Sequence, residues 1–95
     1  MAKGYWIVRV DVNDPEIYKA YVAADAEPFR KYGAHFLVRG GKSVALEGAG
    51  RARNVVIEFA SMDEALACYN SPDYEKARAL RQKSSTGELI LVEGA

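Results

Sequence analysis

The hydrophobic period changes early in the chain, and this change does most to limit the possible folds. Residues 4–12, GYWIVRVDV, alternate with period two, so that four apolar side chains share one face, as in a β-strand. Asp14, Pro15 and Glu16 follow at once, and an Asx residue before a proline and an acid is typical of a helix start. The chain therefore passes directly from a strand into a helix. The four apolar residues are Trp6, Val8, Val10 and Val12.

The first helix is expected to extend toward Gly33. Apolar residues recur at helical spacing from Ile17 to Val22, and Gly33 offers the left-handed conformation that often ends a helix. Pro28 lies inside this segment, where a proline removes one backbone hydrogen bond of the helix. We therefore expect a kink or a break near residues 25–27.

The rest of the chain adds strands and a second helical region. Ser61 and Glu64 form a capping box, and Ser71 before Pro72 restarts the helix, which Gly87 is expected to end. Strands are expected at residues 34–39, 55–60 and 89–92. The order strand, helix, strand, strand, helix, strand predicts an α+β, ferredoxin-like βαββαβ protomer with a four-stranded antiparallel sheet. We expect one such domain over residues 1–95.

Both faces of the predicted sheet are apolar. In the third strand Val55, Ile57 and Phe59 oppose Val56, and in the last strand leucines at 89 and 91 oppose Ile90 and Val92. Two helices can cover only one face of such a sheet. The sequence therefore predicts a homodimer joined sheet to sheet, in which a second copy covers the other face.

Composition limits the partners and the location. Thirteen basic and thirteen acidic residues leave no net charge, and the basic residues form no block, so neither nucleic acid nor an anionic membrane is an expected partner. No apolar run approaches the roughly 18 residues that span a bilayer, and the N-terminus lacks the apolar core of a signal peptide. Cys68 is the only cysteine, which fits a reducing compartment. We expect a cytoplasmic protein.

The stretch 39–48, RGGKSVALEG, looks like the end of a phosphate-binding loop but lacks its requirements. Such a loop needs a glycine five residues before Gly-Lys-Ser, where this chain has Phe36, and a helix directly after it. We expect instead that Gly40 and Gly41 bend the edge of the sheet and aim Arg39 inward. Residues 43–47 would then form a short arm of the second strand that reaches the second copy.

Several short sequence motifs, taken in their order along the chain, resemble those of a known family. They are KGYWI, DPEIYKAY, RGG followed by LEG, VVIEF, CYNSPDYEKARALR and VEG. Together they are similar to the small bacterial family known as domain of unknown function 1330, within the dimeric α/β-barrel superfamily. The resemblance covers nearly the whole chain and implies a ferredoxin-like protomer that pairs with its twin. It implies no reaction, although the superfamily includes cofactor-free monooxygenases, lactone isomerases and haem-handling proteins.

Arg39, Glu58 and His35 are the candidate catalytic residues. Strict alternation would place His35 and Arg39 on one face of the second strand, and Glu58 is an unexpected acid inside VVIEF. A buried carboxylate needs a partner, and Arg39 is the candidate. We favour a structural ion pair, within the sheet or across the dimer. The alternative is that Arg39 binds a substrate carboxylate or enolate while Glu58 or His35 moves a proton.

No metal or cofactor site is expected. His35 is the only histidine, which rules out a two-histidine metal site within one chain; a haem ligand is a less favoured alternative to a surface role. Cys68 lies among apolar helix residues, and we expect an inert buried thiol rather than a nucleophile.

A group of polar aromatic residues could line a ligand pocket between the helices and the sheet. Simple core packing, with each hydroxyl bonded to backbone or water, is the favoured alternative. The candidate ligand-binding residues are Tyr18, Tyr21, Tyr69, Ser71 and Tyr74.

Two functional classes remain open on the sequence alone. The first is a homodimeric small-molecule-binding protein, a cofactor-free enzyme of monooxygenase or isomerase type acting on a small polar or aromatic metabolite. The second is a non-catalytic dimer that senses a ligand or serves as a structural module. An enzyme would need a proton-transfer group with a shifted pKa in a concave site.

Overall fold

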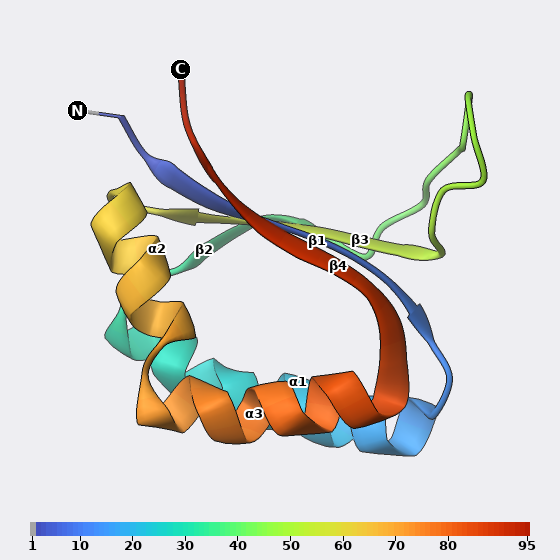
Figure 1. Cartoon of the computed structure of the whole chain (residues 1–95), viewed down its shortest axis with the longest axis horizontal. Helices are drawn as coiled ribbons and strands as arrows, with labels where there is room; N and C mark the ends of the chain where they lie inside the picture. Colours follow the sequence, from blue (N-terminus) through green and yellow to red (C-terminus); the bar gives the residue numbers. More distant parts are fainter. Residues whose placement is uncertain (1) are drawn as a thin grey trace.

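A four-stranded antiparallel sheet carries three helices on one face in the computed structural model, which describes residues 2–95 (Figure 1). The strand order is β2-β3-β1-β4. This arrangement confirms the predicted ferredoxin-like βαββαβ fold. The elements are β1 Gly4–Val12, α1 Pro15–Lys31, β2 His35–Arg39, β3 Arg53–Phe59, α2 Met62–Tyr69, α3 Pro72–Ser84 and β4 Ser85–Glu93.

Helix α1 begins where the sequence predicts but passes through its proline. The Asp14 side chain accepts a hydrogen bond from the backbone N–H of Ile17 at 3.2 Å, which caps the first turn. The expected break near residues 25–27 is wrong, because α1 continues through Pro28 to Lys31. Tertiary contacts hold this last turn: the Phe29 ring packs edge-on against Trp6 with centroids 5.2 Å apart, and the Pro28 carbonyl accepts from the N–H of Tyr32 at 3.0 Å.

The boundary between α3 and β4 also differs from the prediction. Helix α3 ends at Ser84 and β4 begins at Ser85, so Gly87 lies inside the strand, opposite Val10 of β1, and does not end the helix. A Cβ atom at Gly87 would collide with the carbonyl oxygen of Arg9. Glycine is therefore needed here for close approach of two strands rather than as a helix stop.

The segment between β2 and β3 is a loop. Residues 43–47 form no strand, so the predicted extension of the second strand is wrong. Gly40, Gly48 and Gly50 adopt left-handed backbone angles, with φ between 67° and 75°, which glycine adopts without steric cost. Figure 1 shows the loop rising on the side of the sheet away from the helices.

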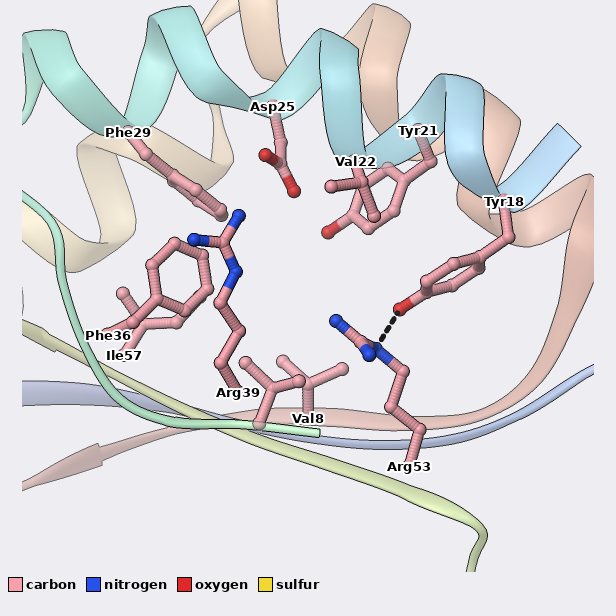
Figure 2. A pocket seen from close by; sticks show the side chains of 11 residues that line it. Val8, Tyr18, Tyr21, Val22, Asp25, Phe29, Phe36, Arg39, Arg53 and Ile57 are labelled. Carbon is pink, nitrogen blue, oxygen red and sulfur yellow. Dashed lines mark hydrogen bonds between the residues drawn. The ribbon is translucent and has the colours of Figure 1, made fainter. Parts of the chain in front are cut away.

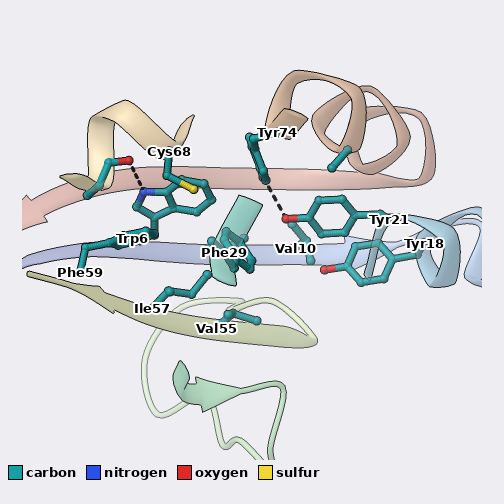
Figure 3. Packing of buried hydrophobic residues seen from close by; sticks show 13 residues of the cluster. Trp6, Val10, Tyr18, Tyr21, Phe29, Val55, Ile57, Phe59, Cys68 and Tyr74 are labelled. Carbon is teal, nitrogen blue, oxygen red and sulfur yellow. Dashed lines mark hydrogen bonds between the residues drawn. The ribbon is translucent and has the colours of Figure 1, made fainter. Parts of the chain in front are cut away.

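The core lies between the helices and the inner face of the sheet (Figure 3), where the Trp6 ring packs against four other aromatic rings. Trp6 is fully buried and its indole N–H donates to the Ala65 carbonyl oxygen at 2.9 Å, so its one polar atom is satisfied. The outer face is apolar as predicted but uncovered in the single chain: Ile90 and Leu37 are each 53 % exposed and Val38 is 43 % exposed. None of the helices among residues 2–95 combines the length and the apolar composition that a membrane span requires.

Candidate active site

A β-bulge in β2 decides which way Arg39 points. His35 pairs with Glu58, Phe36 with Ile57 and Arg39 with Val55, and the register shifts between Phe36 and Val38. The extra residue reverses the alternation beyond it. The prediction that His35 and Arg39 share a face is therefore wrong, because the bulge puts Arg39 on the helix side and leaves His35 on the outer side.

The expectation that Arg39 points inward is confirmed, because its side chain lines a pocket between α1 and strands β2 and β3 (Figure 2). Its guanidinium lies 4.1 Å from the centre of the Phe36 ring, a cation–π contact that fixes its place. Arg39 remains exposed overall, so it lies at the mouth of the pocket. The turn into the pocket comes from the bulge, which precedes the two glycines.

The pocket combines an apolar wall with a few convergent polar groups. Figure 2 shows Asp25, Tyr18 and Tyr21 descending from α1 toward Arg39 and Arg53, which rise from the sheet. The volume open to a water molecule is about 20 Å³, enough for about one water. The apolar wall is formed by Val8, Val22, Phe29, Phe36, Val55 and Ile57.

Asp25 is the most unusual group in the pocket. It is only 4 % exposed, and its Oδ1 atom has no hydrogen-bond partner among residues 2–95. Burial raises the pKa of Asp25 from 3.8 to about 7, and the charges of Arg39 and Arg53 oppose that rise. A carboxyl group in this position can take or give a proton near neutral pH.

Arg53 faces Asp25 from β3, the strand that pairs with the β2 strand of Arg39. Its Nε donates a hydrogen bond to the Tyr18 hydroxyl at 3.2 Å, and its guanidinium lies 5.4 Å from the centre of the Tyr18 ring. These contacts hold Arg53 without neutralising its charge. The pocket therefore presents two guanidinium groups, which favour an anionic oxygen.

Tyr21 is held by a second tyrosine behind the pocket. The hydroxyl groups of Tyr21 and Tyr74 are 2.9 Å apart, as Figure 3 shows. Burial raises the pKa of Tyr74 to about 12 and that of Tyr21 well above its usual 10. Both phenols are thus neutral near pH 7, and Tyr21 can act there as a hydrogen-bond donor or acceptor but not as a base.

The remaining predicted ligand residues lie elsewhere. Ser71 caps α3: its hydroxyl donates to the Cys68 carbonyl at 2.8 Å and accepts from the N–H of Tyr74 at 3.2 Å. Tyr69 packs edge-on against Trp6, with centroids 5.8 Å apart, and lines a different cavity. The structure therefore brings Tyr18, Tyr21 and Arg39 together but places Ser71 and Tyr69 outside their pocket.

Glu58 lies on the outer face, away from Arg39. It accepts a hydrogen bond from the Tyr5 hydroxyl at 3.1 Å and lies 3.8 Å from the Lys3 ammonium. The predicted Arg39–Glu58 ion pair within the sheet is therefore wrong, because the two side chains point to opposite faces. His35, opposite Glu58, is exposed.

Sequence reasoning missed Asp25 and Arg53. Asp25 lies four residues after Tyr21 and seven after Tyr18, so helical spacing places this acid on the buried face of α1. The strand expected at residues 55–60 leaves out Arg53, whereas β3 begins at Arg53 and so places it in alternation with Val55. Within residues 2–95, no three His, Cys, Asp or Glu side chains gather in a way that could hold a metal ion.

The fold and the pocket define a ferredoxin-like α+β protein with a buried acid facing two arginines. The chain belongs to the family described as "Domain of unknown function (DUF1330)", whose model matches residues 3–95. This confirms the resemblance found in the sequence. No curated protein sequence matches the chain.

Solved structures share the fold at low sequence identity. A protein of unknown function from Rhodopseudomonas palustris is 17 % identical with a TM-score of 0.81, over 99 % of this chain and 83 % of its own. SnoaB, a cofactor-independent oxygenase from Streptomyces nogalater, is 15 % identical with a TM-score of 0.62, over 97 % and 92 % of the two chains. A dimeric ferredoxin-like protein of unknown function from Thermobifida fusca is 18 % identical with a TM-score of 0.59, over 99 % and 91 %.

Proposed function

We propose that the protein is a cofactor-free enzyme that moves a proton on a small polar or aromatic metabolite carrying a carboxylate or an enolisable carbonyl. One observation carries this proposal: the buried Asp25 carboxyl, with a pKa of about 7, faces Arg39 and Arg53 in one pocket. A general base works best when its pKa lies near the operating pH. Asp25 therefore replaces Glu58 and His35 as the proposed proton-transfer group.

The proposed step needs only groups of this chain. Ionised Asp25 takes a proton from a carbon next to the carbonyl. The electron pair of the broken C–H bond forms a carbon–carbon double bond, and the π pair of the carbonyl moves onto its oxygen. Arg39 and Arg53 stabilise the enolate oxygen that forms. Return of the proton from Asp25 to a different atom completes an isomerisation, and the enzyme regains its starting state.

An oxygenase would share the first half of this step. SnoaB is described as a cofactor-independent oxygenase, and an enolate or phenolate is the kind of electron-rich intermediate that can react with molecular oxygen as a second substrate. Isomerisation consumes no oxygen. Oxygen uptake during turnover therefore separates the two reactions.

The small free volume favours a second candidate, a non-catalytic ligand-sensing or structural module. About 20 Å³ is open to water, so any metabolite larger than a water must displace side chains at the pocket mouth. Arg39 is exposed, so it can move aside at the cost of its cation–π contact with Phe36. A pocket that never opens would support the non-catalytic function.

We also propose that the protein is a homodimer joined through the outer face of the sheet. Exposed Leu37, Val38, Ile90 and Val92 form a wide apolar surface there, and such surfaces usually mark an interaction site. The solved Thermobifida fusca neighbour is described as dimeric. Sedimentation of the wild-type protein at micromolar concentration tests this, and a monomer would contradict it.

Two measurements test the proton-transfer function. Carbon-13 NMR of Asp25 should show a titration midpoint near 7. A midpoint below about 5 would contradict the proposal that Asp25 is the proton-transfer group. Acetoacetate and phenylpyruvate, incubated with the protein in D₂O, should exchange the hydrogens next to the carbonyl faster than in buffer. Asp25→Asn should lower this rate by at least about 100-fold, whereas Asp63→Asn, at an exposed acid of α2, should leave it unchanged. Equal rates in Asp25→Asn and wild type would refute the proposal.

A further inference from the structure

A second cavity lies between the end of α3 and strands β1 and β4. It shares no lining residue with the Asp25 pocket, and about 220 Å³ within it is open to water. Its lining is mainly polar and includes Tyr69, Arg81, Gln82 and Ser85, with Val10, Gly87 and Leu89 from the strands.

Arg81 is a buried charge without a counterion in this cavity. It is 7 % exposed, its Nε has no hydrogen-bond partner, and no carboxylate among residues 2–95 lies within ion-pair distance of it. Buried arginines are almost always paired, because removing a guanidinium from water without compensation is costly. An unpaired Arg81 therefore indicates that something else supplies negative charge.

Neighbouring groups of the chain do not supply it. Asp11 and Glu88 adjoin the lining strand residues in sequence, but both bind Arg51, at 2.8 and 2.6 Å. The positive charge of Arg81 acts to lower the pKa of Tyr74, but burial prevails and raises that pKa to about 12. Tyr74 is thus neutral near pH 7 and offers no counterion. Lys83, in the same last turn of α3, adds a further positive charge.

We propose that this cavity is a binding site for a small oxyanion, a carboxylate or a phosphate, held by the Arg81 guanidinium. The forked N–H groups of arginine match two oxygens of either anion. Gln82 and Tyr69 line the same cavity, and the amide and phenol groups of these residues can add hydrogen bonds to an anion. Ser85 is less available, because its hydroxyl donates to the Arg81 carbonyl at 2.7 Å.

The site is independent of the proton-transfer pocket. The anion would sit at the end of α3, and this cavity shares no lining residue with the pocket that contains Asp25. Loss of anion binding therefore leaves the proposed base in place, and loss of the base leaves the anion site in place.

Nitrogen-15 NMR of the arginine Nε–H groups tests the proposal directly. Sodium benzoate and inorganic phosphate are titrated separately at constant ionic strength, with sodium chloride as the reference. The Arg81 Nε–H signal should shift and saturate with at least one of the two anions. A saturating shift with benzoate alone identifies a carboxylate site, and one with phosphate alone identifies a phosphate site. Saturating shifts with both anions identify a site that accepts either oxyanion. A shift no larger than with chloride for both anions overturns the proposal.

Variants separate specific binding from general attraction to positive charge. Arg81→Gln should weaken anion binding by at least about tenfold, and Arg81→Lys, which keeps the charge but loses the fork, should weaken it by several-fold. Lys83→Gln, the matched control on the exposed side of the same turn, should retain wild-type affinity. Undiminished anion binding in Arg81→Lys together with a loss of binding in Lys83→Gln would overturn the assignment to Arg81. If Arg81→Gln does not fold, the response of the Arg81 Nε–H signal in the wild-type protein still decides whether Arg81 binds the anion.

Discussion

Replacing Asp25 with asparagine should make the protein more stable at neutral and alkaline pH and leave it unchanged in acid. Asp25 is 4 % exposed, and burial raises its pKa from 3.8 to about 7 in the folded protein. Between these values the folded protein holds a proton that the unfolded chain has lost. Stability therefore falls as pH rises through this window and is level above it.

The expected size of the effect follows from the shift. The pKa rises by roughly three units, and each unit corresponds to about 1.36 kcal/mol. Ionised Asp25 therefore lowers the free energy of unfolding by about 4 kcal/mol at pH 8, and asparagine, which cannot ionise, avoids this cost. Near pH 4 the aspartic acid is neutral in the folded protein, and the two proteins should differ little.

Urea denaturation at one-unit steps from pH 4 to pH 8 measures this difference at a fixed protein concentration. The gap between Asp25→Asn and wild type should open between pH 4 and pH 7 and stay constant above. Asp63→Asn, the exposed control, should stay within about 0.5 kcal/mol of wild type at every pH. Parallel stability curves for Asp25→Asn and wild type would show that Asp25 is ionised in the folded protein at ordinary acid pH, and would refute the reasoning.

Three further changes test the fold and the dimer. Ser71→Ala removes the cap of α3 and leaves the N–H of Tyr74 without its partner, so it should cost about 1 kcal/mol by urea denaturation; no loss would contradict the cap. Gly87→Ala should cost about 1–3 kcal/mol, because its Cβ collides with the Arg9 carbonyl, and wild-type stability would disprove the close approach. Ile90→Lys on the outer face should give a monomer in sedimentation, while Leu66→Lys, equally exposed but on α2, should not; a dimeric Ile90→Lys would exclude this face as the interface.

Local chemistry in the sequence was enough to predict the fold. Capping residues such as Asp14 and Ser71 mark helix starts by short-range hydrogen bonds, which depend on neighbours in the chain. The helix passing through Pro28 and the strand that includes Gly87 depend instead on distant partners, the core around Trp6 and the carbonyl of Arg9. The sequence patterns within α1 and β4 alone do not indicate these distant contacts.

The candidate site was harder to predict because it depends on register. Counting alternate residues places Arg39 on the same face of β2 as His35, and a single extra residue in the strand sends it to the other face. A bulge has no reliable sequence mark when it contains an ordinary residue such as Leu37. Asp25 was predictable in principle, since an acid on the apolar stripe of α1 conflicts with burial, and such conflicts are common at functional sites.

Gly40 shows how the loop after β2 serves the pocket. Its φ of 68° suits glycine, and its N–H donates to the Asn54 carbonyl at 2.8 Å, closing the end of the ladder between β2 and β3. A Cβ at this position would collide with the guanidinium of Arg53. The side chain of Arg53 therefore crosses over Gly40 toward Tyr18 through the space that a side chain at position 40 would occupy. The two cations of the pocket are thus positioned by different features: Arg39 by the bulge in β2, and Arg53 by the space left beside Gly40.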